Sequence, residues 1–156
     1  MFKFFKKKKS KPSAFRAVSG ADQRVEANEQ TKVLFEAINF DLDEEYQPVQ
    51  SVFVPKEDGI YVISSTFSFQ PDVTDENYRT RIQIQKNGDP AVDGDNDFWG
   101  TGVDFKNAVQ TSSILELEAG DRVEIFAQST LAGFIKINQP GLSITYFSAD
   151  RLIELK

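Results

Sequence analysis

The residues best suited to chemistry in this sequence are aspartates in the segment 89–106. Asp93, Asp95 and Asp97 alternate there with a glycine and an asparagine. Carboxylate oxygens at alternate positions suit Ca²⁺, which prefers hard oxygen ligands. The stretch is not an EF-hand loop, because Phe98 occupies the position of that loop's glycine and the twelfth position holds no glutamate. We therefore predict a calcium site at these three aspartates, with a solvated, metal-free acidic loop as the alternative.

The composition argues against most kinds of enzyme. The chain has no histidine and no cysteine, which removes disulfides, the commonest general base and the usual zinc ligands. Asp41, Asp43, Glu44 and Glu45 could supply the acid and base of a glycosidase, but any acidic surface offers such pairs. The sequence has no phosphate-binding glycine loop, cofactor fingerprint or nucleophile elbow. We predict a non-enzymatic protein, with a carbohydrate-active enzyme as the weaker alternative.

The first 13 residues form a basic tail in which three phenylalanines come before a lysine run. Lys6, Lys7, Lys8 and Lys9 suit peripheral contact with an anionic membrane or polymer, since each lysine contributes about 1 kcal/mol near such a surface. The alternative is a solubilising or docking tail. The apolar run is too short for a secretory signal or a bilayer span. We therefore expect cytoplasmic synthesis and leave association with a surface or particle open.

The rest of the chain is acidic. Without residues 1–13 it holds 12 basic and 24 acidic residues, a net charge of −12. Duplex nucleic acid requires a basic face, so we do not expect it as a partner. A length of 156 residues and a hydrophobic content of 40% suffice for one domain with a real core. We predict a flexible tail over 1–13, one domain over 14–149 and a short C-terminal tail over 150–156.

Apolar and polar residues alternate through much of the chain after residue 13, which is typical of strands with one buried face. Such runs lie at 59–69, 81–85, 115–118, 122–128 and 142–146. Asn87-Gly88 predicts a tight hairpin, and the segment 119–121 predicts another turn. No stretch of twelve residues shows a helical period. Many short strands indicate a sandwich or jelly roll, and we expect 89–106 to be a long loop with room for one short strand.

A set of spaced residues resembles the signature of the complement C1q globular-head family. The set is Phe35, Asp41, Tyr46, Phe53, Gly59 and Tyr61, which reads F-x5-D-x4-Y-x6-F-x5-G-x-Y. Three further segments are similar to family motifs: AFRA at 14–17, KNG at 86–88 and LELEAGDRV at 115–123. The likeness spans residues 14–148. The aromatic signature residues are most simply core residues, so they indicate architecture and not a ligand site.

The resemblance implies an all-β jelly roll of about ten strands in two sheets, like that of tumour necrosis factor, which assembles as a homotrimer. It places Tyr61 at the trimer interface, and the last strand adds Tyr146 and Phe147 as candidates. The implied function is a binding, recognition or adhesion head whose loops engage a protein or glycan partner. The alternative is a purely structural trimerisation module of a phage, spore or cell-surface assembly. Relatives that bind calcium near the top of the trimer support the calcium hypothesis.

Overall fold

The protein is built from β-strands. The computed structural model describes residues 11–99, 107–137 and 144–155, and over 95–99 it describes the backbone alone. Those residues form thirteen strands and no helix, in two antiparallel sheets. The all-β, two-sheet jelly-roll prediction is confirmed. The number of strands exceeds the expected ten because five of them are only two or three residues long.

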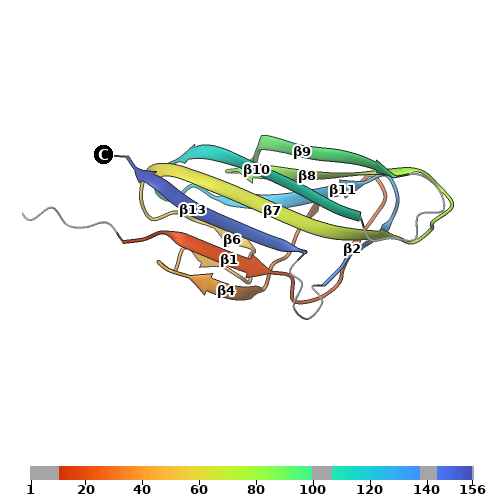
Figure 1. Ribbon diagram of the computed structural model, residues 1–156, viewed down its shortest axis with the longest axis horizontal. Coiled ribbons are helices and arrows are strands. Elements are labelled where there is room, and N and C mark those ends of the chain that lie inside the picture. The colour runs from red at the N-terminus through yellow and green to blue at the C-terminus, as the bar shows by residue number, and fades with distance from the viewer. Residues whose placement is uncertain (1–10, 100–106, 138–143, 156) are drawn as a thin grey trace, which may run out of the picture.

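The first sheet, called sheet A, is organised around one long strand. Its members are β1 (Ala14–Val18), β2 (Gln23–Val25), β4 (Ala37–Asp41), β7 (Gly59–Pro71), β10 (Asn107–Leu117), β12 (Gly133–Ile135) and β13 (Tyr146–Glu154). β7 pairs with β10 along one side and with β13 and then β12 along the other. β1 and β4 extend the sheet beyond β13 (Figure 1).

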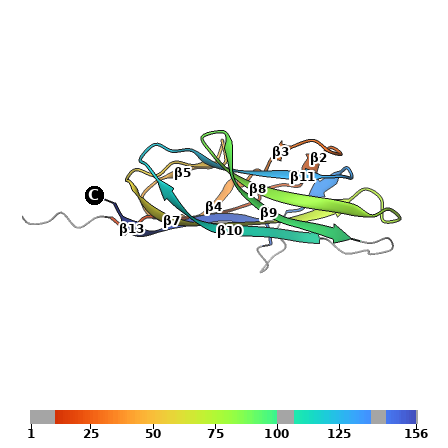
Figure 2. The same ribbon diagram turned by 90° about the horizontal axis from the view of Figure 1, so that it is seen from above.

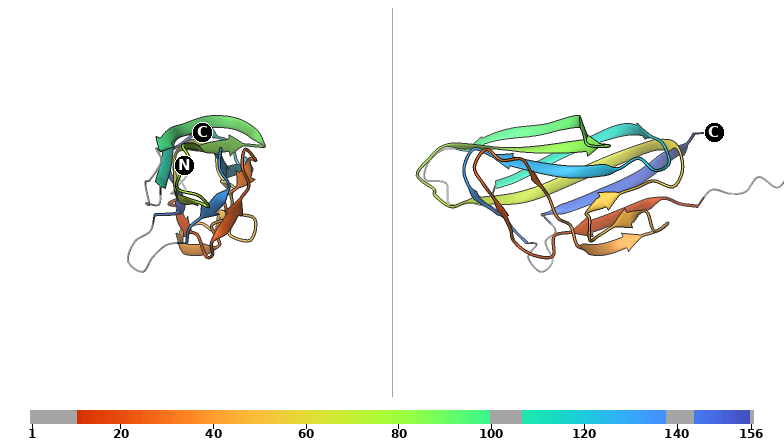
Figure 3. Two further views of the ribbon diagram at one scale, coloured as in Figure 1. Left: turned by 90° about the vertical axis from the view of Figure 1, so that its right-hand side faces the viewer. Right: turned by 180° about the vertical axis from the view of Figure 1, so that it is seen from behind.

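The second sheet, called sheet B, covers the other side of the core. Its members are β3 (Thr31–Lys32), β5 (Tyr46–Gln47), β6 (Val52–Phe53), β8 (Tyr78–Lys86), β9 (Asp89–Trp99) and β11 (Val123–Ser129). β8 lies between β11 and β9, and β9 is the edge strand. Figure 2 shows β11 and β8 in a layer facing that of β7 and β13, and the end-on view in Figure 3 shows the two sheets curving around a common interior.

Alternating side chains of both sheets fill this interior. The large, fully buried ones are Phe15, Tyr61, Ile63, Phe67, Phe69, Leu117 and Phe147 from sheet A, and Phe53, Ile82, Ile84 and Ile125 from sheet B. The ring of Phe15 stacks on those of Tyr46 and Phe53, with centroids 4.5 and 5.0 Å away. Such aromatic pairs add to the stability gained from burial. The alternation seen in the sequence therefore becomes the contact between the two sheets.

The predicted hairpin at Asn87-Gly88 is confirmed. Lys86 pairs with Asp89 across the turn, and both turn residues have positive φ, 55° and 87°. Two left-handed residues make a turn whose twist matches that of the flanking strands. This hairpin joins β8 to β9.

The acidic segment differs from its prediction as a long loop. Residues 89–99 form the strand β9, paired with β8 with two register irregularities. Aspartate and glycine are weak strand formers, but an edge strand tolerates charge because one of its sides stays open to solvent. Backbone pairing with β8 therefore outweighs local propensity here.

The predicted C-terminal boundary is also wrong. β13 continues to Glu154, which pairs with Gly59 of β7, and a register irregularity lies between Arg151 and Ile153. Residues 150–154 therefore belong to sheet A and not to a tail. The start of β1 and the end of β13 lie at the same end of the molecule (Figure 1).

Candidate functional site

The six signature residues lie in the core or at its rim. The four aromatic ones are buried: Phe35, Tyr46, Phe53 and Tyr61. The Asp41 carboxylate accepts hydrogen bonds from the backbone N–H groups of Glu45 and Tyr46, at 3.1 and 2.8 Å, and so holds the turn after β4. A Cβ at Gly59 would lie 2.7 Å from the backbone oxygen of Ile153, so this position requires glycine. These six residues determine the architecture.

Tyr61 and Phe147 are wrong as trimer-interface candidates. Both are 0% exposed within a single chain. The Tyr61 hydroxyl donates to the Glu57 carbonyl oxygen at 2.8 Å, and the Phe147 ring meets Phe15 edge-on at 4.9 Å. Strand alternation turns both side chains toward the chain's own core. Since Tyr146 and Phe147 are adjacent on one strand, they face opposite sides, so the sequence itself could have shown that both cannot belong to one interface.

Tyr146 is on the opposite side of β13, on the surface of sheet A that faces away from the core. We call this surface the outer face. By register and alternation it carries Ala14, Arg16, Phe40, Val62, Ser64, Gln110, Ser112, Ile114, Tyr146, Ser148 and Asp150. Hydroxyl groups occupy its centre, and apolar side chains lie toward its edges. Ile114 is 62% exposed and Phe40 is 46% exposed.

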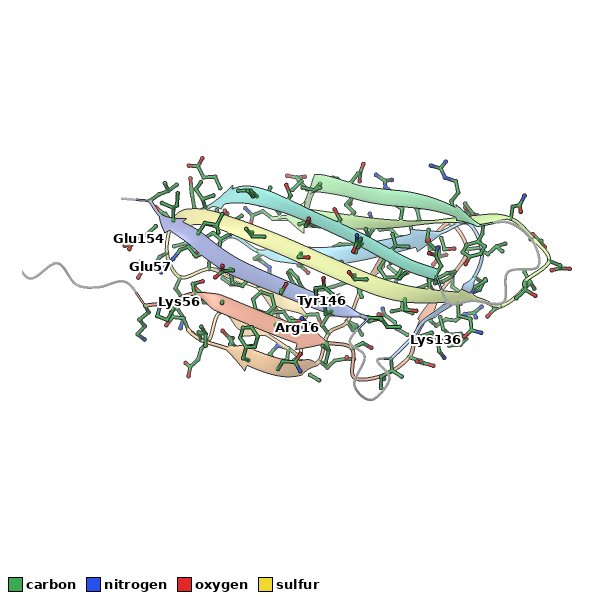
Figure 4. The ribbon with its side chains drawn as sticks, in the orientation of Figure 1. Arg16, Lys56, Glu57, Lys136, Tyr146 and Glu154 are labelled. Atoms are coloured by element: carbon green, nitrogen blue, oxygen red, sulfur yellow. The ribbon has the colours of Figure 1, made fainter. Side chains whose placement is uncertain are left out.

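The outer face is hollowed beside β1. A shallow cavity of about 320 Å³ lies there, lined by Ala14, Phe15, Arg16, Phe40, Val62, Ser148, Ala149 and Asp150. Next to it, Arg16 lies over the Tyr146 ring on the neighbouring strand (Figure 4). Sequence reasoning missed Arg16, although its alternation with Phe15 and Ala17 places it opposite the core. The face combines apolar area with a few polar groups, as protein interfaces do.

The acidic strand β9 is only partly described at the level of side chains. The Asp93 carboxylate accepts a hydrogen bond from Gln83 at 2.6 Å and forms an ion pair with Arg81. The hydrogen bonds from Arg81, which has the larger effect, and from Gln83 lower the pKa of Asp93. The side chains of Asp95 and Asp97 lie outside the described residues. Among the described side chains no cluster of three metal-ligating residues occurs, so the calcium site stays a prediction.

The other carboxylates singled out in the sequence have structural partners or lie in solvent. Glu45 is buried and accepts hydrogen bonds from the Ser13 hydroxyl at 2.5 Å and the Lys56 backbone N–H at 2.8 Å. Asp43 forms an ion pair with Lys11 at 3.3 Å. Glu44 is exposed in a left-handed turn conformation, with φ of 55°. Bound in this way, Glu45 and Asp43 anchor the chain that precedes β1.

Residues 11–13, predicted as part of the N-terminal tail, are anchored to the domain. Lys6, Lys7, Lys8 and Lys9 lie outside the described residues. Lys11 and Ser13 are described and anchored by Arg151. The Arg151 guanidinium donates to the Lys11 carbonyl oxygen at 2.7 Å, and the Arg151 backbone N–H donates to the Ser13 carbonyl oxygen at 3.0 Å. Residues 11–13 are therefore part of the folded domain and not of the tail. No helix in the described part of the chain could cross a membrane.

Solved structures of other proteins share the fold of this chain. This chain is similar to Eiger TNF from S. frugiperda, with a TM-score of 0.64 and 11% identity, over 94% of this chain and 96% of the other. Murine APRIL matches with a TM-score of 0.62 and 16% identity, over 91% of this chain and all of the other. The globular domain of zebrafish complement 1qA matches with a TM-score of 0.61 and 18% identity, over 94% of this chain and all of the other. The fold is that of the tumour necrosis factor and complement globular domains.

The family follows from the sequence comparison. The C1q domain profile matches residues 14–148, which is most of the chain. The protein therefore belongs to the C1q-domain family. Among curated protein sequences, none matches this chain closely enough to show a relationship. Domains of this class typically form trimers, bind partners and are generally non-enzymatic.

Proposed function

We propose that this protein is a non-enzymatic, homotrimeric head that assembles through the outer face of sheet A and engages a protein or glycan partner through its loops. The observation that carries the proposal is the exposure of large apolar side chains on a sheet face, chiefly Ile114 and Phe40. Exposed apolar surface beside polar groups is typical of interaction sites. Ile153, at 59% exposed, extends the same face toward the end of β13.

A closed ring of three suits this surface. Trimers with threefold symmetry use a head-to-tail contact, in which two different patches of each subunit meet. The outer face offers two such patches, because the apolar residues lie on β10 at one side of the sheet and on β4 at the other. β7, β13 and β1 lie between them, and their outward side chains include small, polar ones, such as Ser64, Thr66 and Ser148.

A charge placed on this face tests the assembly. Ile114→Asp should shift the protein from trimer to monomer in sedimentation velocity, because a buried, unpaired carboxylate is strongly unfavourable at an interface. Val49→Asp is the matched control: Val49 is 92% exposed and lies outside sheet A, so this variant should stay trimeric. Equal masses for both variants and the unaltered chain would contradict the proposed interface.

A screen against glycans and cell-surface proteins tests the binding role. Saturable binding of one ligand class by the trimer is the expected result. Self-assembly without any saturable ligand would instead favour a purely structural trimerisation module. Turnover of a glycan that is lost when single carboxylates are replaced would contradict the non-enzymatic assignment.

A further inference from the structure

A polar hollow lies on sheet B, away from the outer face of sheet A. It has a volume of about 290 Å³ and is lined by Asn28, Arg79, Arg81, Gln128, Ser129 and Thr130. β8 supplies both arginines, the end of β11 supplies Gln128 and Ser129, and the loop before β3 supplies Asn28. We call it the arginine hollow. Because it belongs to the other layer of the sandwich (Figure 2), assembly through sheet A leaves it accessible.

The two arginines share a face because they alternate along β8. Residues i and i+2 of a strand lie about 7 Å apart on the same side. Across the sheet, Gln128 pairs directly with Arg81. Thr130 holds the backbone of Arg79 with two hydrogen bonds, of 2.9 and 3.0 Å. Two guanidinium groups are thus presented beside an amide and a hydroxyl on a rigid sheet.

Arg79 supplies a positive charge that no described carboxylate neutralises. None of the ion pairs among the described side chains involves it. Arg81 is paired with Asp93, and its Nε is buried with no hydrogen-bond partner among the described groups. Asp93 therefore does not use all the donors of Arg81. In a chain body with a net charge of −12, this is a local site of positive potential.

The remaining lining groups suit a polyhydroxyl compound. The Gln128 amide donates to the Asn28 carbonyl oxygen at 2.9 Å, which fixes the loop over the hollow and leaves the Gln128 side-chain oxygen as an acceptor. The Asn28 amide and the Thr130 hydroxyl add donors and acceptors. The volume is at the small end of the range of about 300–1,000 Å³ for ligand pockets, which corresponds to a single sugar ring.

We propose that the arginine hollow binds one acidic sugar residue, with its carboxylate or sulfate group held by Arg79 and Arg81 and its hydroxyls by Asn28, Gln128 and Thr130. Guanidinium groups match the geometry of planar and tetrahedral oxyanions. A long polyanion would meet the acidic body around the hollow, whereas one charged residue would not. The proposal names a ligand class for the binding role above and rests on that role, but not on trimerisation.

The test is a titration of the isotopically labelled full chain, followed through backbone amide signals in NMR. Methyl glucuronide and methyl glucoside 6-sulfate should give saturable shifts confined to residues 28, 79–81 and 128–130. Methyl glucoside, which is neutral, should bind at least about tenfold more weakly, because it lacks a charge-assisted hydrogen bond, which contributes about 1.5–3 kcal/mol. Inorganic sulfate should also bind at least about tenfold more weakly, because it lacks the ring hydroxyls that Asn28, Gln128 and Thr130 would hold. Equal affinity for methyl glucoside, or for sulfate alone, would overturn the acidic-sugar assignment.

Two arginine variants separate the site from general charge effects. Arg79→Gln should weaken binding of both acidic sugars about tenfold or more. Arg122→Gln, the same change just before the other end of β11, should leave binding unchanged. Unchanged affinity in Arg79→Gln, or no shifts with either sugar at millimolar concentration, would overturn the proposal. Light scattering on the same samples separates the sugar site from the proposed trimer. A monomer that binds the acidic sugars would contradict the trimer alone. A trimer that binds only other glycans would contradict the arginine hollow as the site.

Discussion

The guanidinium carbon of Arg16 lies 4.4 Å from the centre of the Tyr146 ring, on adjacent strands of the outer face (Figure 4). A cation over an aromatic ring contributes about 0.5–1 kcal/mol at an exposed site. The pKa of Tyr146 is lowered, chiefly by a hydrogen bond with Ser64. Burial is the next largest effect and opposes this shift, while a hydrogen bond with Thr66 and the charge of Arg16 lower the pKa further by smaller amounts. The pKa of Tyr146 is therefore sensitive to what lies against the outer face.

Alkaline titration should reveal this pair. Burial raises the pKa values of Tyr46 and Tyr61, so Tyr146 should ionise at lower pH than either. We expect this order of ionisation in the Ile114→Asp monomer, measured through tyrosinate absorbance. In the same monomer, the added change Arg16→Gln should move the ionisation of Tyr146 to higher pH. In the trimer the step should also move upward, since a neighbouring subunit would exclude water from the phenol. A first step that survives Tyr146→Phe would contradict the assignment.

The anchored segment predicts two different results for two truncations. A chain that begins at residue 11 should unfold in denaturant like the full chain. A chain that begins at residue 14 should lose about 1–3 kcal/mol, because the buried Glu45 loses the Ser13 hydroxyl and Arg151 loses two carbonyl acceptors. Ser13→Ala in the full chain isolates the hydroxyl. Both truncations should be compared at one protein concentration, and identical midpoints would show that residues 11–13 contribute nothing.

The basic tail should control attachment to anionic surfaces. We expect the full chain to co-sediment with vesicles that contain phosphatidylserine at low salt and to detach as salt rises, because screening weakens the attraction of Lys6, Lys7, Lys8 and Lys9. The chain that begins at residue 11 should not bind, since it holds 13 basic and 24 acidic residues, a net charge of −11. Neutral vesicles are the control. If both chains ignore the anionic vesicles, the tail is a spacer or a docking peptide.

Calcium should stabilise the protein if Asp93, Asp95 and Asp97 bind it. A ligand that binds only the folded state raises the melting temperature by mass action. The ion must share Asp93 with Arg81 or displace it, so we expect weak, millimolar binding. Asp93→Asn should abolish the effect, and Asp75→Asn, an exposed acid elsewhere, should not. No heat in a calorimetric titration, together with an unchanged melting temperature, would leave the acidic strand without a metal.

Much of the fold could be predicted because period-two alternation and turn residues are local signals. The runs at 81–85 and 122–128, and the turn at Asn87-Gly88, show this. β9 could not be predicted in the same way, because its aspartates and glycine disfavour a strand until β8 supplies a partner. The same holds for residues 150–154, which extend β13 only because β7 continues beside them.

The candidate sites depended more strongly on tertiary structure. Strand parity could have separated Tyr146 from Phe147, and it could have placed Arg79 and Arg81 on one face. The arginine hollow itself could not be foreseen, because Asn28 and Gln128 meet only when the loop before β3 folds onto β11. Contacts between residues 100 positions apart leave no local pattern in a sequence.

The central claim is assembly through the outer face, and the mass of the unaltered chain in solution tests it most directly. Light scattering coupled to gel filtration, at micromolar concentration, should give three times the chain mass of 17.6 kDa. The account predicts that this value persists on dilution through the micromolar range. A stable species of 17.6 kDa across that range would contradict the trimer and leave the apolar face of sheet A without its proposed partner.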